Sequence, residues 1–416
     1  MNIIPQLSMF GENEFEELGD LERLKEVLEV LPDEKLIGAL YRIRGQGRND
    51  WPCEAMWNSF VANFMFEHPT VEALLRELRR NKQLREICGF VPRWHKLEDG
   101  TIKVNTAPSE SAYSNFLKNL KSCKSELKEI FENLVQYMYD HLDGFGEDLM
   151  ADGKAIQSFA TKLSDRKAND RRGEHDADWC KKTYTVSGKN GEKKTKEVKW
   201  FGFRLHLIAD ANYELPVAFT VTKASNSEQK ERLEKCKHFM ADKGYDSSKL
   251  INLLERNDII PIIDIRNCWK DDDPTRQYRN TDLVYDYQGN VWYVKDDGSL
   301  EKLLYRGYDK GTDSLRYGFH PRMKDHRIFR IKCDEDRRIF TPVARDSKKW
   351  KRLYNKRSGI ERINGRIDRD YKFEKHTIRG LAKMDMFITV TLLVYLAMAK
   401  AKIERGMTEH LGRLYA

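Results

Sequence analysis

The chain has 416 residues, of which 34% are charged, and a mean hydropathy of −0.71, which predicts a soluble protein of two or three domains with a sizeable core. Its 74 Lys and Arg residues exceed its 66 Asp and Glu residues, so the formal net charge is +8. The seven cysteines are scattered and include no C-x-x-C pair, which argues against a zinc ribbon and a disulfide framework and fits a reducing compartment.

The basic residues are clustered at 162–172, 193–199 and 348–357. Clusters of this kind on a nearly balanced chain favour a polyanionic partner, first of all nucleic acid, although solvated loops have the same composition. The N-terminus has no basic stretch followed by an apolar segment, so no signal peptide is expected. The apolar segment 387–399 is shorter than the roughly 20 residues of a membrane-spanning helix, so we expect a buried helix and no membrane contact.

Residues 1–143 are expected to be helical. Segment 71–90 places leucines at helical spacing, with Arg and Lys on the other face. Segment 107–142 begins with Pro and Ser at an N-cap position and then has an apolar residue at every third or fourth position. The two segments either form a helix-turn-helix-like unit that binds DNA or pack together without touching DNA.

Residues 144–267 predict a mixed α/β sheet. A short apolar strand at 148–152 precedes a hairpin at 201–225, whose apolar residues alternate on both sides of a turn. A further strand at 238–242, a helix at 247–257 and a buried strand at 259–266 then form a parallel crossover.

Two strands of this sheet contain the same Met-Ala-Asp stretch. The first leads to Asp152 and then Gly153, and the second leads to Asp242 and a Lys-Gly-Tyr turn. Asp and Gly both favour turns, which is one explanation. The other is that two strand ends each present a carboxylate to a shared metal site.

Other acids and histidines in this region have structural explanations. We expect Asp246 to cap the following helix and Asp210 to lie in the hairpin turn, and Asp264 to be either a buried residue with its hydrogen bonds satisfied or part of a strand-end turn. His206 and His238 alternate with apolar residues, so they are expected in the core rather than on a metal.

Short β runs and turn dipeptides predict an antiparallel β-rich insertion at 268–345, followed by C-terminal helices at 346–416. Within these helices Tyr354, Arg357 and Glu361 fall on one face, within an arc of about 60°. Isoleucines at the same spacing form a separate apolar stripe. An ordinary exposed helix with an Arg–Glu pair would give the same pattern.

Together these stretches resemble the DDE transposases of bacterial insertion sequences, in the group marked by a Y-x2-R-x3-E signature. The resemblance rests on LMADGKAI with Asp152, FMADKGYDS with Asp242, and YNKRSGIERINGRI with Tyr354, Arg357 and Glu361. Their order fits, with 90 residues between the two aspartates and 119 from Asp242 to Glu361. The resemblance covers roughly residues 145–400 and, more loosely, the helical N-terminal part.

The resemblance implies an α/β fold: an RNase H-like mixed sheet flanked by helices, with a β-rich insertion and a helical N-terminal domain. The domains would be a DNA-binding domain at 1–143, the first part of the catalytic domain at 144–267, the insertion at 268–345 and the rest of the catalytic domain at 346–416.

In such an enzyme Asp152, Asp242 and Glu361 would be both the catalytic residues and the ligands of two Mg²⁺ ions, which Mn²⁺ could replace. Asp152 would bridge the two ions, while Asp242 and Glu361 would each hold one.

The resemblance also implies DNA contacts from Tyr354, Arg357, Lys243 and Tyr245. A lysine often lies seven residues beyond the glutamate in this group, and here that position is Asp368. The DNA-end contact of that lysine therefore has no counterpart at this position.

The implied activity is metal-dependent cleavage at the ends of an insertion sequence and strand transfer into target DNA. The partners would be double-stranded DNA, as terminal inverted repeats and as target, and a second copy of the chain in a homodimer. The location would be the bacterial cytoplasm, at the nucleoid when DNA is bound. Two alternatives remain at this level: an RNase H-like nuclease without strand transfer, and a non-catalytic DNA-binding protein derived from a transposase.

Overall fold

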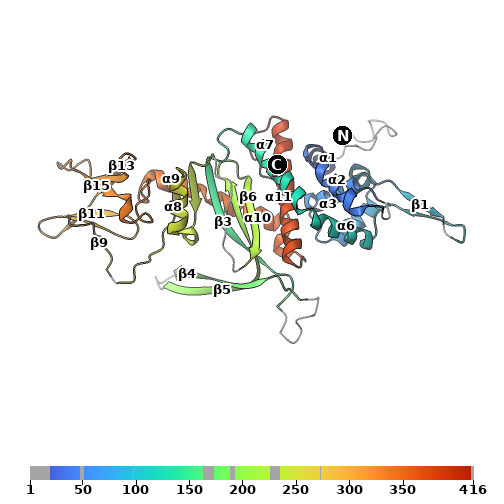
Figure 1. Cartoon of the computed structure of the whole chain (residues 1–416), viewed down its shortest axis with the longest axis horizontal. Coiled ribbons are helices and arrows are strands. Elements are labelled where there is room, and N and C mark those ends of the chain that lie inside the picture. The colour runs from blue at the N-terminus through green and yellow to red at the C-terminus, as the bar shows by residue number, and fades with distance from the viewer. Residues whose placement is uncertain are drawn as a thin grey trace.

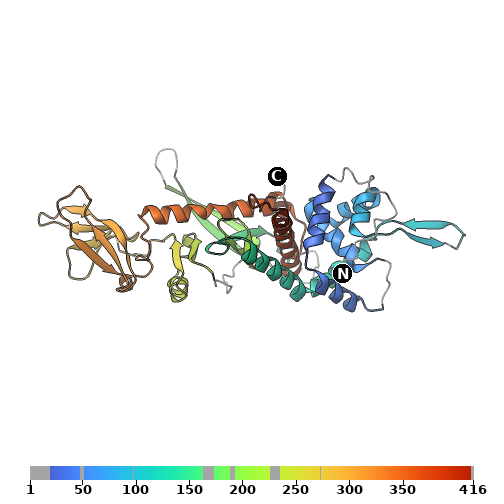
Figure 2. The ribbon, with the colours of Figure 1, turned by 90° about the horizontal axis from the view of Figure 1, so that it is seen from above.

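The structure is a computed structural model that describes residues 19–46, 51–96, 98–162, 173–187, 193–224, 235–271 and 273–413. The molecule is elongated, with a central sheet, a β-rich unit at one end and a group of helices at the other (Figure 1). A view from above shows one long helical stretch running from the β-rich unit to the centre (Figure 2).

The N-terminal part is helical, as expected, with one hairpin. Its elements are α1 (Asp20–Val30), α2 (Glu34–Arg44), α3 (Cys53–Met65), α4 (Val71–Arg80), α5 (Lys82–Cys88), β1 (Arg93–Lys96), β2 (Ile102–Asn105), α6 (Glu110–Ser122) and α7 (Lys124–His141). The predicted helix at 71–90 is two helices, because Asn81 ends α4 and its side chain caps α5 by accepting a hydrogen bond from the Leu84 amide. The hairpin of β1 and β2 projects from the helices into solvent (Figure 1).

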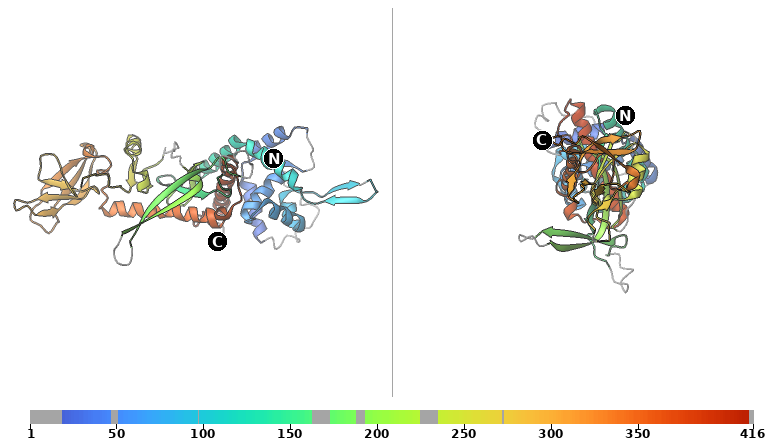
Figure 3. Two further views of the ribbon diagram at one scale, coloured as in Figure 1. Left: turned by 90° about the horizontal axis from the view of Figure 1, so that it is seen from below. Right: turned by 90° about the vertical axis from the view of Figure 1, so that its left-hand side faces the viewer.

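The central sheet contains β3 (Asp148–Gln157), β4 (Asp178–Ser187), β5 (Lys193–Asp210), β6 (Pro216–Lys223), β7 (His238–Ala241) and β8 (Ile260–Ile263). Its order is β6-β5-β3-β7-β8, with β3, β5 and β6 antiparallel and with β7 and β8 parallel to β3. β4 pairs with the first half of the long strand β5, and this ribbon extends away from the body of the molecule (Figure 3). The helix α8 (Ser248–Arg256) connects the parallel strands β7 and β8.

The C-terminal helices are α9 (Lys348–Lys356), α10 (Ser358–Arg369) and α11 (Leu381–Glu404). α9 packs on β7 and β8, α10 packs on β3, and α11 packs on α7 and β6. α11 includes the apolar segment 387–399 and is long and apolar enough to cross a membrane, but 78% of its apolar window is buried inside the protein. It is therefore the central core helix, as expected.

The insertion forms two antiparallel sheets around a core of its own. One sheet has the order β12-β11-β10-β9 and the other β13-β14-β15. The strands are β9 (Arg276–Gln277), β10 (Leu283–Tyr285), β11 (Val291–Val294), β12 (Leu300–Lys302), β13 (Leu304–Asp309), β14 (Ser314–Gly318) and β15 (Ile328–Lys332). Short 3-10 turns lie at η4 (Lys243–Tyr245), η5 (Cys333–Glu335) and η6 (Phe373–Lys375). The architecture is thus α/β, a mixed sheet flanked by helices, with a helical N-terminal part and a β-rich insertion, as expected.

Candidate active site

Asp152 and Asp242 lie on neighbouring strands at the same level of the sheet. β3 and β7 are parallel, and Ala151 pairs directly with Ala241. Each aspartate is the next residue after its paired alanine, so the two carboxylates start from adjacent positions of the backbone. Asp264 comes directly after Ile263 of β8, which pairs with Ala241 of β7, so a third carboxylate continues the same row.

The two Met-Ala-Asp stretches differ in the backbone beyond the aspartate. We expected both strands to end there, but β3 continues through Gly153 to Gln157. The reason is pairing: β5 contacts β3 in unbroken register from Leu149 to Gln157, whereas the pairing of β3 with β7 ends at Ala151. Inter-strand hydrogen bonds thus override the turn preference of Asp and Gly.

Asp242 does lie at a strand end, as expected. Its Oδ1 accepts a hydrogen bond from the Gly244 amide at 2.8 Å, and its carbonyl oxygen accepts one from the Tyr245 amide at 3.0 Å. The carboxylate therefore shapes the turn η4 while its other oxygen is available to a cation. Lys243 is exposed on this turn.

Tyr245 lies against both aspartates. Its hydroxyl would be 3.8 Å from a Cβ placed on Gly153, and among the described residues this buried hydroxyl finds no hydrogen-bond partner. Burial raises the pKa of Tyr245, and the negative charges of Asp152 and Asp242 raise it further. The phenol is therefore a neutral group close to the two carboxylates.

Glu361 lies in the first turn of α10. The single helix expected over 354–368 is interrupted at Arg357, between α9 and α10, although Arg357 itself keeps helical backbone angles. Arg357 Nη2 donates to Glu361 Oε1 at 2.8 Å, and 61% of the Glu361 side chain is exposed. Tyr354 lies on the same side, with the Arg357 guanidinium carbon 5.6 Å from its ring centre. The three residues of the signature are thus neighbours, as the periodicity predicts.

Two contacts that sequence reasoning missed fasten α10 to β3. Asn364 Nδ2 donates to Asp152 Oδ2 at 2.9 Å, and Lys154 forms an ion pair with Asp368. Asn364 lies three residues after Glu361, so helical spacing would have placed it beside the glutamate. Asp368 occupies the position where a lysine was expected, and here the lysine comes from the strand instead, two residues after Asp152 on the same face.

These groups fit a divalent metal ion. The oxygens of Asp152, Asp242 and Glu361 are ligands that Mg²⁺ prefers. Asn364 Oδ1 is a buried acceptor with no hydrogen-bond partner in the described structure, directly beside Asp152. Within that part of the chain no three acidic, His or Cys side chains already surround a common point, and Glu361 is held by Arg357. In this structure the oxygen donors are therefore close along the sheet and helix but are not gathered around one point.

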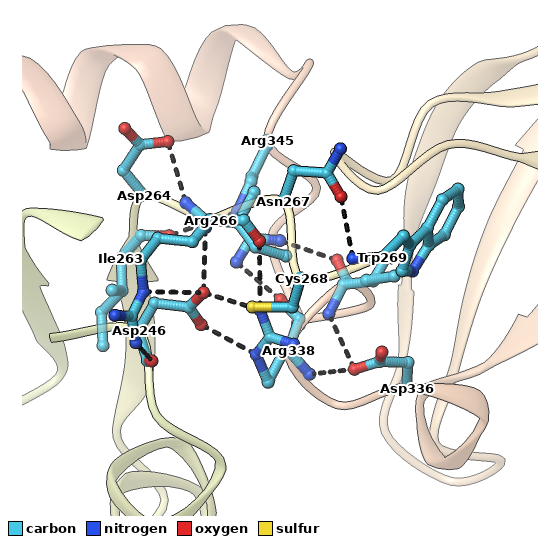
Figure 4. Close-up of polar contacts among 12 residues, drawn as sticks. Asp246, Ile263, Asp264, Arg266, Asn267, Cys268, Trp269, Asp336, Arg338 and Arg345 are labelled. Carbon is cyan, nitrogen blue, oxygen red and sulfur yellow. Dashed lines mark hydrogen bonds and ion pairs between the residues drawn. The ribbon is translucent and has the colours of Figure 1, made fainter. Parts of the chain in front are cut away.

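Asp246, four residues after Asp242, anchors the turn to the insertion (Figure 4). Its side chain is fully buried, and Arg338 donates to its two oxygens at 3.1 and 2.7 Å, while the Arg266 amide donates at 2.9 Å. Burial alone would raise the pKa of Asp246, but these donors hold it below its usual value. The expected helix-capping role was wrong, because Ser247 is the N-cap residue of α8 and the Asp246 carboxylate is engaged elsewhere.

Arg345 joins the place where the insertion begins to the place where it ends. Its guanidinium donates to the carbonyl oxygens of Ile263 at 3.2 Å, Ile339 at 2.8 Å and Arg338 at 2.7 Å (Figure 4). Burial lowers the pKa of Arg345 to about 10. Asp264 lies beside it directly after the end of β8, in a segment without an assigned turn, and its Oδ1 accepts a hydrogen bond from the Ile265 amide at 2.9 Å.

The remaining expectations for single residues concern Asp210 and two histidines. Asp210 is buried at the end of β5 and accepts hydrogen bonds from the amides of Gly146, Asn212 and Tyr213 at 2.7 to 2.9 Å, so it organises the hairpin turn as expected. His206 is buried in β5, and His238 is half-buried in β7.

Comparison with known proteins gives two family matches. The model of the Transposase DDE domain matches residues 168–397, and that of the Transposase domain (DUF772) matches residues 12–101. The first match includes Asp242 and Glu361 and begins after Asp152. Curated protein sequences contain no significant match.

Among solved structures, the chain is similar to the cryo-EM structure of the piggyBac transposase synaptic complex with hairpin DNA. The TM-score is 0.37 and the identity 9%, with 95% of this chain and 78% of that chain covered. This likeness is too weak to assign a family. The match to the Transposase DDE domain spans more than half of the 416 residues and therefore shows the family. The chain belongs to the DDE transposases, and it is a DNA transposase of the insertion-sequence type.

Proposed function

We propose that this transposase cuts DNA at the ends of its insertion sequence with Mg²⁺ and joins the freed 3′-OH to target DNA. The supporting observation is the parallel register of β3 and β7, which sets Asp152 beside Asp242 while Asn364 ties α10, and with it Glu361, to Asp152. These contacts support a site in which a carboxylate from each of the three segments would meet at one edge of the sheet.

Two Mg²⁺ ions, or Mn²⁺ ions in their place, would activate the attacking hydroxyl and stabilise the leaving oxygen of an in-line displacement. Asp152 would bridge the ions, and Asp242 and Glu361 would each hold one. Arg357 neutralises Glu361 before DNA arrives. Once Glu361 turns to a cation, the Arg357 guanidinium is free for a DNA phosphate.

Two of the other three predicted DNA contacts, Tyr354 and Lys243, are consistent with the same geometry. Tyr354 next to Arg357 offers a ring for a displaced base. Lys243 is exposed at the turn after Asp242 and is placed for a phosphate. Tyr245 is half-buried between the aspartates, so its contribution would be to support the carboxylates from below rather than to grip DNA.

We further propose a homodimer on DNA, since two element ends have to be joined to one target, with residues 1–143 binding the terminal inverted repeats. Size-exclusion chromatography with light scattering, run with and without end-containing duplex, tests the assembly. A complex that contains one chain per two ends would overturn it. The proposed location is the bacterial cytoplasm, at the nucleoid when DNA is bound.

The central experiment uses the full-length protein and a labelled duplex that carries the element end, with Mg²⁺ or Mn²⁺. Asp152→Asn, Asp242→Asn and Glu361→Gln should each lower the cleavage rate by roughly a thousandfold or more, because each removes a metal ligand. Asp296→Asn, at an exposed acid of the insertion, is the matched control and should cut normally. Mn²⁺-dependent thermal stabilisation of the protein gives a second readout, which the three site variants should lose.

Two outcomes would change the proposal. Cleavage that survives Asp152→Asn or Glu361→Gln would overturn the residue assignment. Cleavage without any joined product, even with a pre-cut 3′-OH end supplied, would favour the alternative of a nuclease that only hydrolyses.

A further inference from the structure

A cavity of about 580 Å³ lies along α10 and borders Glu361. We call it the arginine groove; it is lined by Ser358, Glu361, Arg362, Gly365, Arg366, Arg369, Asp370 and Arg413. Four of these eight residues are arginines. The groove is separate from the face of α10 that carries Asn364 and Asp368 to β3.

Helical geometry explains why Glu361 belongs to both faces. At 100° per residue, Asn364 and Asp368 lie on one side of Glu361, and Gly365 and Arg369 lie on the other. Ile360, Ile363 and Ile367 are fully buried on the back of the helix. A polymer that runs along the arginine groove therefore passes Glu361.

The arginines on the α10 side are held in place. Glu214, in the turn between β5 and β6, accepts hydrogen bonds from Arg362 and Arg366, both at 2.7 Å. Burial would raise the pKa of Glu214, but these two arginines lower it, so the carboxylate is charged and the pair of guanidinium groups is fixed. One wall of the groove is thus rigid and only partly neutralised.

The other two arginines lack a close ion-pair partner in the described structure, although Asp370, which also lines the groove, lies near enough to Arg369 for the two charges to interact. Across the described ranges, no carboxylate lies within ion-pair distance of Arg369 or Arg413, and Arg369 Nε meets only the Gly365 carbonyl oxygen, at 3.4 Å. The segment carrying Arg413 is fixed from below, because Lys402 Nζ donates to the Arg413 carbonyl oxygen at 2.6 Å. Two guanidinium groups without a close ion pair thus line the same open channel.

The floor of the channel is glycine. A Cβ placed on Gly365 would meet nothing within 4 Å, although Gly365 is inside a helix where alanine would be favoured by roughly 1 kcal/mol. A longer side chain at this position would project into the groove and fill it.

We propose that the arginine groove binds the phosphodiester backbone of the DNA strand that enters the active site past Glu361. Guanidinium groups recognise phosphate oxygens in pairs, and this is the ligand chemistry that four arginines on one open channel select. The proposal rests on the proposed function, since it takes Glu361 as part of the catalytic centre.

The test measures duplex binding in EDTA at several salt concentrations, and cleavage with Mg²⁺. Each lost phosphate contact lowers the slope of log affinity against log salt by about one. Arg369→Gln with Arg413→Gln should therefore reduce this slope by about two and weaken binding. Arg256→Gln, an exposed arginine on α8 away from the groove, is the matched control and should leave the slope unchanged.

A second pair of variants tests the channel without removing any arginine. Gly365→Glu should block the groove and lower both DNA affinity and the cleavage rate at least tenfold, and Gly365→Ala should leave both close to wild type. Mn²⁺-dependent thermal stabilisation should be unchanged in all of these variants, because the metal ligands are intact.

The outcomes separate this proposal from the proposed function. If the wild type cleaves DNA but the arginine pair and Gly365→Glu keep the wild-type slope and rate, the groove proposal is overturned and the function stands. A slope that Arg256→Gln lowers equally would also overturn it, since any surface charge would then have the same effect. If the wild type binds DNA with the expected slope changes but never cleaves it, the proposed function fails instead.

Discussion

Asp152 and Asp242 each end a Met-Ala-Asp stretch, yet they are held in different ways. Asp152 lies inside β3, which pairs with β5 beyond the aspartate. Asn364 of α10 donates a hydrogen bond to its carboxylate. Asp242 lies where β7 ends, and its turn is fixed from the insertion through Asp246. Identical local sequence thus leads to two backbone conformations, because the neighbouring strand, rather than the glycine, decides whether the chain continues.

The largest expected effect, on the free energy of unfolding, concerns Asp246, which fixes the turn after Asp242. Asp246→Asn should destabilise the catalytic region by about 3–5 kcal/mol, because Arg338 would be left without its buried partner. Urea unfolding measures the loss, and hydrogen exchange at the Gly244 amide should accelerate more than exchange in β3.

Asp258→Asn is the control for that variant, since its ion pair with Lys310 is fully exposed and should not affect unfolding measurably. If Asp246→Asn unfolds at the wild-type urea concentration, or loosens β3 as much as η4, the two aspartates do not have separate anchors.

The next largest effect, on the cleavage rate, concerns the glycines that follow the two aspartates, Gly244 and Gly153. A Cβ on Gly244 would lie 2.8 Å from Asp242 Oδ1, so Gly244→Ala has to displace the carboxylate. We expect cleavage to fall about a hundredfold with little change in stability, as for a displacement of roughly 1 Å in a catalytic group. Gly153→Ala meets Arg204 Cδ at 3.4 Å, an ordinary contact, and should keep the wild-type cleavage rate. Equal losses in the two variants would show that both strands end in turns after all.

The smallest effect, on the pH dependence of stability, concerns a contact between β3 and β7. Asp148, at the start of β3, lies 2.7 Å from His238 Nδ1 of β7 and accepts a hydrogen bond from Lys356 at 2.5 Å. These contacts, the one with His238 first, lower the pKa of Asp148 to about 2. Since the folded value lies below the unfolded one, the stabilisation is complete above about pH 4 and is lost as the pH falls towards 2.

The stabilisation from Asp148 amounts to about 2 kcal/mol. Asp148→Asn should remove it at neutral pH and flatten the stability curve between pH 4 and 2. Unfolding by urea across this range checks the expectation. A variant whose stability still falls as steeply as the wild type would place the acid sensitivity in another group.

Much of the fold and of the candidate site could be predicted from the sequence, because the relevant signals are local. Short apolar runs identified the strands that lead to Asp152 and Asp242, and helical spacing placed Tyr354, Arg357 and Glu361 together. The extension of β3 could not be predicted, since it depends on pairing with a strand some fifty residues further along. Nor could the partner of Asp246, which is 92 residues away in the insertion.

The ion pair between Lys154 and Asp368 likewise joins residues that are far apart in the sequence, so it could not be predicted from the local motif. A motif read along the helix shows an acid where a base was expected, while the fold brings a base to that place from β3. The domain limits at 143, 267 and 345 remain predictions.

The contacts of Arg345 have a consequence for how this chain can change. Because one guanidinium holds the end of β8 to the segment that leads into α9, the β-rich insertion leaves and rejoins the sheet at a single point. Inserted units with adjoining ends are tolerated because they impose little strain on their host. Residues can therefore be gained or lost within the insertion's outer loops without altering the distance between the second aspartate and the glutamate.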